Sequence, residues 1–151
     1  MAPGVALSDL DWLAFALAVL VNLVLGFLWY NPKLPTGAAW AKATGMAPDH
    51  KPTAKQMAKA LVLAVLGAVF IMVVLAHTFV AYRDAYRLDQ PGYDLTLGDG
   101  LTGALFVWLG FFVPVLWAQQ AWENRPWSLF FVHAGYYLAV LLVAGALLVT
   151  V

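Results

Sequence analysis

The sequence predicts an all-α membrane protein whose single domain, residues 1–151, is a bundle of four transmembrane helices. Of the 151 residues, 64% are hydrophobic and only 11% are charged, whereas about a quarter are charged in soluble domains. Four long segments carry almost no charge, and a helix of about 20 such residues crosses the hydrocarbon of a bilayer. Backbone exposed to lipid must satisfy its own hydrogen bonds, so these segments should be helical. Four buried helices of a soluble protein would lack the charged residues needed to solubilise them.

The uncharged segments give approximate bounds for the helices and for two of their connections. The four helices are expected at about residues 12–30, 59–82, 98–122 and 127–151. The third and fourth are joined by the short segment 123–126, which predicts antiparallel neighbours. Pro114 interrupts the third helix and should kink it or free a carbonyl group.

The first connection, residues 31–59, is the longest, and it contains a further predicted element. Segment 36–45 is rich in alanine and ends at Gly45, which favours a short helix. Trp40 and the flanking lysines suit a helix that lies in the headgroup region of the membrane. Thr53 is placed to cap the second transmembrane helix.

The distribution of charge predicts the orientation of the chain. If the first and third connections face the cytoplasm, that side holds six basic residues and the opposite side holds two. The six are Lys33, Lys42, Lys51, Lys55, Lys59 and Arg125, and the two are Arg83 and Arg87. Basic residues concentrate on the cytoplasmic side of membrane proteins. Both termini are therefore expected on the outer side, where most of the acidic residues would also lie.

A few polar residues within the apolar segments form a candidate binding cluster near the cytoplasmic side. They are Asn22, Gln119, Gln120, His133, Tyr136 and Tyr137. At 1.5 Å per residue, His133 lies ~9 Å below Trp127 and Asn22 lies ~12 Å below Tyr30, so the two are at similar depth. Tyr136 and Tyr137 follow His133 at the spacings that share a helix face.

Three interpretations of this cluster stay open from the sequence. Its hydrogen bonds could simply tie the helices together. Polar groups in hydrocarbon are also candidates for a proton or ligand site. In the third interpretation His133 is the axial ligand of a tetrapyrrole. Apart from that one alternative, the sequence predicts no cofactor.

Several classes of function are disfavoured. The absence of cysteine excludes disulfides and thiolate chemistry, and a net charge of zero argues against a nucleic-acid partner. No phosphate-binding glycine loop, no Ser-His-Asp order and no His-Glu-x-x-His motif is present. We therefore expect neither an enzyme nor a metal site.

The ends of the predicted helices carry a family resemblance. The motifs are Gly26-Phe27-Leu28-Trp29-Tyr30-Asn31-Pro32, Ala39-Trp40-Ala41-Lys42 with Gly45, Trp108-Leu109-Gly110-Phe111 with Pro114, Trp122-Glu123-Asn124-Arg125-Pro126, Phe130-Phe131 and Ala134-Gly135-Tyr136-Tyr137. In their order and spacing they resemble a bacterial membrane family known as domain of unknown function 1761. The sequence departs from that pattern at His133 and at residues 34–36. The resemblance implies a bacterial inner-membrane protein with periplasmic termini, and it carries over no catalytic residue.

The small size of the chain favours a non-enzymatic module over a private transport pathway. We expect a lipid-embedded accessory subunit of a larger membrane complex, or a homo-oligomer. Small residues at helical spacing support close helix contacts: Ala60, Ala64 and Ala68, and Gly135 and Ala139. The alternatives are a small transporter for protons, cations or a metabolite that uses the polar cluster, and a pigment- or haem-binding subunit that uses His133.

Overall fold

The computed structural model describes residues 10–47 and 50–151, and all regular secondary structure in these ranges is helical. The elements are α1 (Trp12–Trp29), α2 (Pro35–Thr44), α3 (Ala54–Asp89), α4 (Leu97–Val107), the π-helical turn η2 (Trp108–Phe112), α5 (Val113–Glu123) and α6 (Trp127–Thr150). Four segments are long and apolar enough to cross a membrane: α1, α3, the continuous stretch from α4 to α5, and α6. The predicted all-helical class with four long apolar helices is confirmed.

Side chains at the helix starts explain where three of these segments begin. The Asp11 carboxylate accepts hydrogen bonds from the backbone N–H groups of Leu13 and Ala14, at 2.8 and 3.0 Å. Thr53 caps α3 as predicted, and Gln56 completes a reciprocal capping box with it. Thr96 begins α4 in the same way. Each cap satisfies N–H groups that have no partner within the helix.

The predicted bounds of α3 were too narrow. The expected segment was 59–82, whereas the helix contains 36 residues, from Ala54 to Asp89. At 1.5 Å per residue it is about 54 Å long, which exceeds the ~30 Å of bilayer hydrocarbon. The loss of hydropathy at its charged ends marks where the apolar span stops, and the backbone continues as helix beyond that point.

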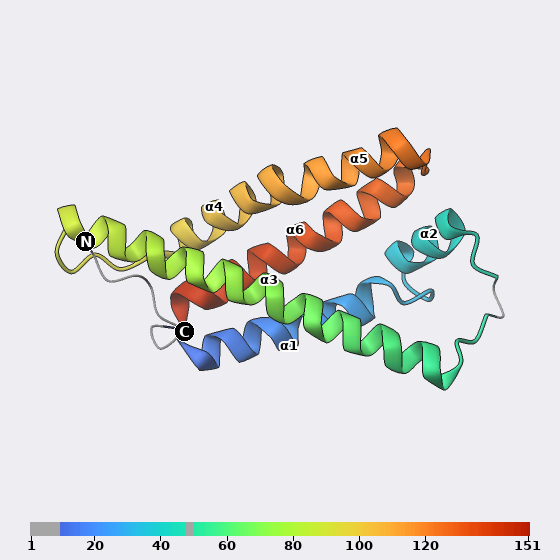
Figure 1. Ribbon diagram of the computed structural model, residues 1–151, viewed down its shortest axis with the longest axis horizontal. Coiled ribbons are helices and arrows are strands. Elements are labelled where there is room, and N and C mark those ends of the chain that lie inside the picture. The colour runs from blue at the N-terminus through green and yellow to red at the C-terminus, as the bar shows by residue number, and fades with distance from the viewer. Residues whose placement is uncertain (1–9, 48–49) are drawn as a thin grey trace.

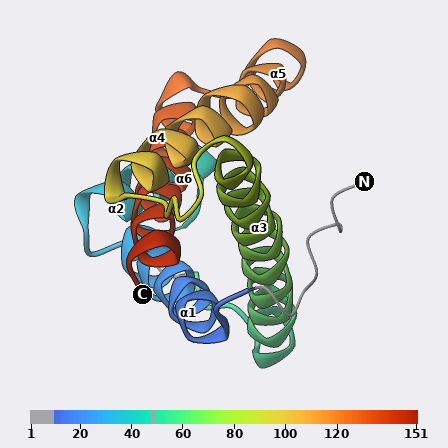
Figure 2. The same ribbon diagram turned by 90° about the vertical axis from the view of Figure 1, so that its left-hand side faces the viewer.

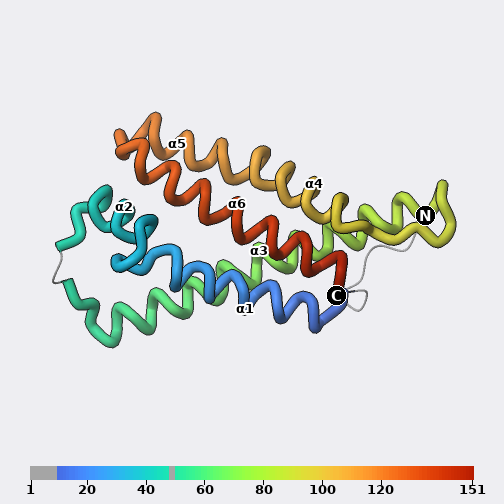
Figure 3. The backbone as a smooth tube through the Cα atoms, turned by 180° about the vertical axis from the view of Figure 1, so that it is seen from behind, coloured from blue at the N-terminus to red at the C-terminus, as the bar shows by residue number. Residues whose placement is uncertain are grey.

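Helix α6 lies at the centre of the molecule. It packs against α1, α2, α4 and α5 (Figures 1 and 3). The α5–α6 contact confirms the antiparallel pair predicted from the short third connection. Helix α3 packs mainly on α1, and Figure 2 shows it standing apart from α4 and α5.

The closest helix approach joins α4 to α6. A Cβ atom added at Gly100 would lie 2.4 Å from the Gly145 carbonyl oxygen, and one added at Gly145 would lie 2.5 Å from the Gly100 oxygen. Ala104 and Ala144 flank this contact and are fully buried. The two backbones therefore touch, in the manner of small-residue packing in membranes.

The predicted stripes of small residues were only partly correct. Ala68 is buried, but Ala60 and Ala64 are exposed. Gly135 faces the Trp29 ring, which would lie 3.1 Å from an added Cβ atom. The glycine pair at the α4–α6 contact was missed because its partners are distant in the sequence.

The predicted interruption of the third helix takes the form of a π-helical turn. The Val113 N–H donates to the Trp108 carbonyl, five residues earlier. Pro114 then stands in the first turn of α5, where a missing N–H costs little. The wider turn absorbs the proline and lets the helix continue.

The predicted short helix in the first connection is α2. It ends at Gly45, whose φ of 68° is the left-handed conformation expected at such an end. Gly37 is buried against the end of α1, where an added Cβ atom would lie 2.1 Å from the Asn31 carbonyl oxygen. Helix α2 thus folds back over α1 and contacts α6. Its place in the headgroup region stays a prediction.

Candidate functional site

Four polar side chains meet between α1 and α6, and we call Asn22, Tyr30, His133 and Tyr136 the α1–α6 cluster. Asn22 is a buried polar residue with 5% of its surface exposed. The Tyr136 hydroxyl donates to its side-chain oxygen Oδ1 at 2.6 Å, and lies 3.3 Å from its backbone oxygen. The amide oxygen of Asn22 is therefore satisfied inside the protein, as buried polar groups require.

Tyr30 and His133 form the second pair of the cluster. The Tyr30 hydroxyl lies 2.8 Å from His133 Nδ1. The hydroxyl donates in the tautomer that carries the imidazole proton on Nε2. The ring of Tyr30 also packs on that of Tyr136, with centroids 5.2 Å apart, and this contact links the two pairs.

Helix α2 covers the cluster from one side. The Trp40 ring meets the Tyr30 ring edge-on at a centroid distance of 5.5 Å. The hydroxyl of Thr36 donates to the Trp29 carbonyl oxygen at 2.7 Å. The first connection therefore encloses the end of the α1–α6 interface instead of hanging away from it.

Two tryptophans hold α6 from opposite sides, close to the cluster. Trp29 on α1 donates its indole N–H to the Val132 carbonyl oxygen at 3.0 Å. Trp108 on η2 donates to the Ala134 carbonyl oxygen at 2.8 Å. Both bonds link neighbouring helices, so Trp29 does more than the membrane-interface anchoring that its sequence position suggested.

The structure brings only part of the predicted cluster together. Asn22, His133 and Tyr136 belong to it. Tyr137 touches the Tyr136 ring at a centroid distance of 5.1 Å, but it packs mainly toward Phe112, at 4.5 Å. Consecutive helical residues point about 100° apart, so the two tyrosines serve different interfaces of α6.

Gln119 and Gln120 lie apart from the cluster, on the α5 side of α6. Gln119 and Tyr137 line a cavity of about 220 Å³. Gln120 lines a different cavity of about 290 Å³ together with Arg125, beside the α5–α6 turn. Its buried Oε1 atom accepts no hydrogen bond from the described residues. Asn22 and the two glutamines therefore face different sides of α6.

Tyr30 is the member that the sequence interpretation missed. It follows Asn22 by eight residues, a little over two helical turns, so the two side chains lie on the same side of α1. That spacing could have identified it. Its place beside Asn31-Pro32 favoured an interfacial anchor instead.

The chemistry available in the cluster is that of one amide, two phenols and one imidazole. These groups suit hydrogen bonding between helices, and the imidazole can carry a proton or ligate a metal. Among the described residues, no three His, Cys, Asp or Glu side chains gather where they could hold a metal ion.

The family comparison assigns the chain. A family model described as "Protein of unknown function (DUF1761)" matches residues 13–149. The chain belongs to this family. The DUF1761 match covers the whole α1–α6 cluster and confirms the resemblance of the helix-end motifs. No curated protein and no solved structure matches the chain.

Three of the motifs that carry the DUF1761 resemblance converge in the fold. Trp29-Tyr30, Trp108 and residues 134–137 come from three different helical segments. They meet through the indole bond of Trp108 to Ala134 and the ring contact of Tyr30 with Tyr136. The motifs of the sequence thus describe one interface around α6.

Proposed function

We propose that this DUF1761 protein is a non-enzymatic membrane module that associates with other membrane-embedded chains, as an accessory subunit or as a homo-oligomer. The observation that carries the proposal is the state of α3. Residues 54–64, about three turns of this helix, are exposed on every side. The rest of the described chain leaves this length of helix free for another partner.

The composition of that free segment suits contact with another helix. Leu61, Val62 and Leu63 are large, apolar and exposed. Ala60 and Ala64 leave room between them, and an added Cβ atom at Gly67 would meet nothing within 4 Å. Small residues let helix backbones approach closely in lipid, where van der Waals packing drives association.

The α1–α6 cluster supports the non-enzymatic part of the proposal. Tyr136 spends its hydroxyl on Asn22, and Tyr30 pairs with His133. These bonds connect α1 to α6 and so serve the packing of the bundle. An acyl- or phosphoryl-transfer site would need a nucleophile beside a base, and this pairing of phenol, amide and imidazole favours helix association instead.

The test measures the size of the native assembly. The chain, extracted in mild detergent with its lipids, should migrate well above its own mass of 16.4 kDa. Ala64→Leu should shift it toward the monomer, because the larger side chain blocks close approach at an exposed position. Ala16→Leu, a matched change at an exposed alanine of α1, should leave the assembly intact. A wild-type chain that is monomeric in both detergent and lipid, with no partner bound, would contradict the proposal.

The alternative functions both depend on the α1–α6 cluster. Proton, cation or metabolite transport would use His133 and Asn22, and tetrapyrrole binding would use His133 as the axial ligand. Flux into liposomes tests the first, and a visible-light spectrum of the purified protein tests the second. Substitutions at His133, considered below, separate both from a structural role.

A further inference from the structure

A lateral groove separates α3 from the α4–η2 stretch, on the side where α3 stands apart in Figure 2. It consists of two cavities of about 340 and 470 Å³, and both are lined by Thr78 and Val107. Ligand pockets in proteins are commonly about 300–1,000 Å³. The two cavities together therefore have the capacity of a ligand site.

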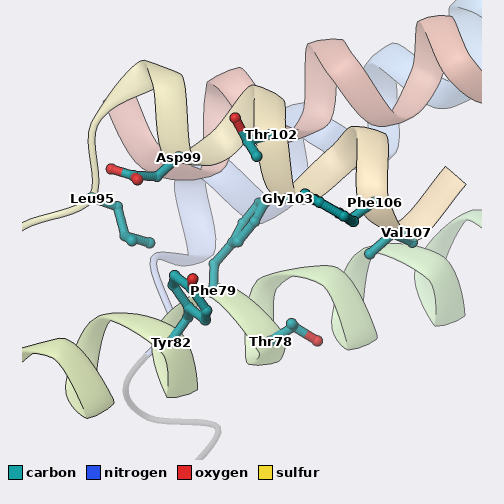
Figure 4. Close-up of a pocket in the computed structure, with 9 residues that line it drawn as sticks. All are labelled: Thr78, Phe79, Tyr82, Leu95, Asp99, Thr102, Gly103, Phe106 and Val107. Carbon is teal, nitrogen blue, oxygen red and sulfur yellow. The ribbon is translucent and has the colours of Figure 1, made fainter. Parts of the chain in front are cut away.

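The two ends of the groove differ in polarity. The end shown in Figure 4, near the α3–α4 connection, includes four polar side chains: Thr78, Tyr82, Asp99 and Thr102. The other end is almost entirely apolar and is lined by Phe70, Ile71, Val74, Leu75, Val107, Phe111, Phe112 and Leu141. This gradient matches a molecule with a polar head and a hydrocarbon tail.

The groove has a firm floor and an open side. Phe79 and Leu141 form the floor and belong to the buried core. The Phe79 ring lies over Gly103, where an added Cβ atom would be 2.5 Å away, so the absence of a side chain shapes the floor (Figure 4). Val74, which is 66% exposed, and Phe111 form the apolar rim. In a bilayer this rim faces hydrocarbon, and a lipid chain can enter sideways.

The length of the groove matches one leaflet. From Asp99 to Phe112 the helix rises about 20 Å at 1.5 Å per residue. One leaflet contributes about 15 Å of hydrocarbon, half of the total thickness, and the polar end adds the headgroup. Asp99 lies in the first turn of α4, at the end of the apolar span.

Asp99 offers a carboxylate oxygen at the polar end. Its Oδ2 atom accepts bonds from the Thr96 N–H at 2.8 Å, the Thr96 hydroxyl at 2.6 Å and the Tyr93 hydroxyl at 2.9 Å. The last bond raises the pKa of the Tyr93 hydroxyl. The Oδ1 atom accepts no hydrogen bond from the described residues, and one acceptor is therefore free for a ligand.

The arginines at this end of the molecule are paired with other carboxylates. Arg83 contacts Asp84 at 3.2 Å, and Arg87 contacts Asp94. Asp99 forms no ion pair with a described residue. A carboxylate without a basic partner, at the mouth of an apolar groove, attracts a cation that carries an apolar tail.

We propose that this groove binds one bilayer phospholipid with a primary-ammonium headgroup, as in phosphatidylethanolamine. One acyl chain lies along the apolar end against Val74 and Phe111. The ammonium group donates to the carboxylate of Asp99. The free side of α3 thereby holds a lipid specifically, in addition to its role in association.

The first test compares two headgroups. The purified protein is incubated with phosphatidylethanolamine and phosphatidylglycerol of identical acyl chains, and retained lipids are counted by native mass spectrometry. The wild type should retain the ethanolamine lipid about two- to fivefold better, the range expected of a partly exposed ion pair. Asp99→Asn, which keeps an acceptor for the helix cap, should abolish the preference. Asp89→Asn removes an exposed carboxylate outside the groove and should preserve it.

The second test fills the groove. Val74→Trp should reduce retention of both lipids, whereas Val24→Trp, at an exposed valine of α1, should not. Equal retention of the two lipids by the wild type, or a preference that survives Asp99→Asn, overturns the proposal. So does a dimer that Val74→Trp dissociates without loss of bound lipid, because a second copy of the chain would then occupy the groove.

Discussion

At the scale of single residues, the bond between His133 and Tyr30 distinguishes a structural histidine from a functional one. His133→Asn keeps a side chain that can hydrogen-bond the Tyr30 hydroxyl, but it cannot carry a proton near neutral pH or ligate a tetrapyrrole well. His133→Leu removes the bond altogether. We expect Asn to be tolerated, and Leu to lower the free energy of unfolding by about 0.5–2 kcal/mol. Denaturation of the purified variants in mixed detergent micelles measures this difference.

The same two variants test the other functions. If His133 carries protons or ligates a pigment, both substitutions abolish flux or the visible absorbance while the helices stay folded. If the structural role is right, neither a flux nor an absorbance of the wild type changes with His133→Asn. Circular dichroism of each variant provides the control for folding.

Residue-scale prediction from the sequence was best where depth alone decides. Asn22 and His133 were placed at similar depth from their distances to the helix ends, and each has its partner in one cluster. The assignment of Gln119, Gln120 and Tyr137 to the same cluster required knowing which neighbour each side of α6 faces. Depth along a helix follows from counting residues, but the neighbours of each face follow from tertiary packing.

At the scale of helices, the Gly100–Gly145 contact sets the distance between α4 and α6. Gly100→Ala places a methyl group 2.4 Å from the Gly145 carbonyl oxygen, and backbone cannot move aside as a flexible side chain can. We expect it to destabilise the bundle by about 1–3 kcal/mol, the usual cost of overpacking. Unfolding in mixed micelles or thermal melting in detergent measures the loss.

Gly67→Ala is the matched control for that substitution. Its added methyl group meets nothing within 4 Å, and alanine favours a helix interior by about 0.5–1 kcal/mol over glycine. It should therefore leave stability unchanged or raise it slightly. Equal losses at Gly100 and Gly67 would show that α4 and α6 do not approach as closely as described.

Helix existence was predictable from the sequence, but helix length and contact were less so. The uncharged segments located all four long helices, because only helices of that length satisfy both the hydrocarbon and the backbone. The extent of α3 was missed because its capping box at Thr53 and Gln56 lies outside the apolar run. The π-helical turn before Pro114 was foreseen only as an interruption, since the sequence does not specify how the backbone absorbs a proline.

At the scale of the whole molecule, the charge distribution predicts how the chain sits in the membrane. The connection that holds α2 leads into Lys51, Lys55 and Lys59, whereas the far end of α3 carries Arg83 and Arg87. Figure 1 shows α2 at one end of the molecule and the C-terminus with the start of α1 at the other. The asymmetry of six basic residues against two therefore separates two physical ends of the bundle.

This asymmetry gives a direct topology test, which the absence of native cysteine makes simple. A cysteine introduced at Asp89 should react with an impermeant thiol reagent in intact cells, and one at Lys51 should not, because basic residues are retained on the cytoplasmic side. Both positions are exposed, so accessibility of the side chain is not in question. A third position, Ser8, should react as Asp89 does, although it lies outside the described residues. Both engineered cysteines must react once the cells are permeabilised, which controls for their chemistry. Labelling of the Lys51 position alone in intact cells would reverse the orientation, and it would place the headgroup end of the proposed lipid groove in the cytoplasmic leaflet.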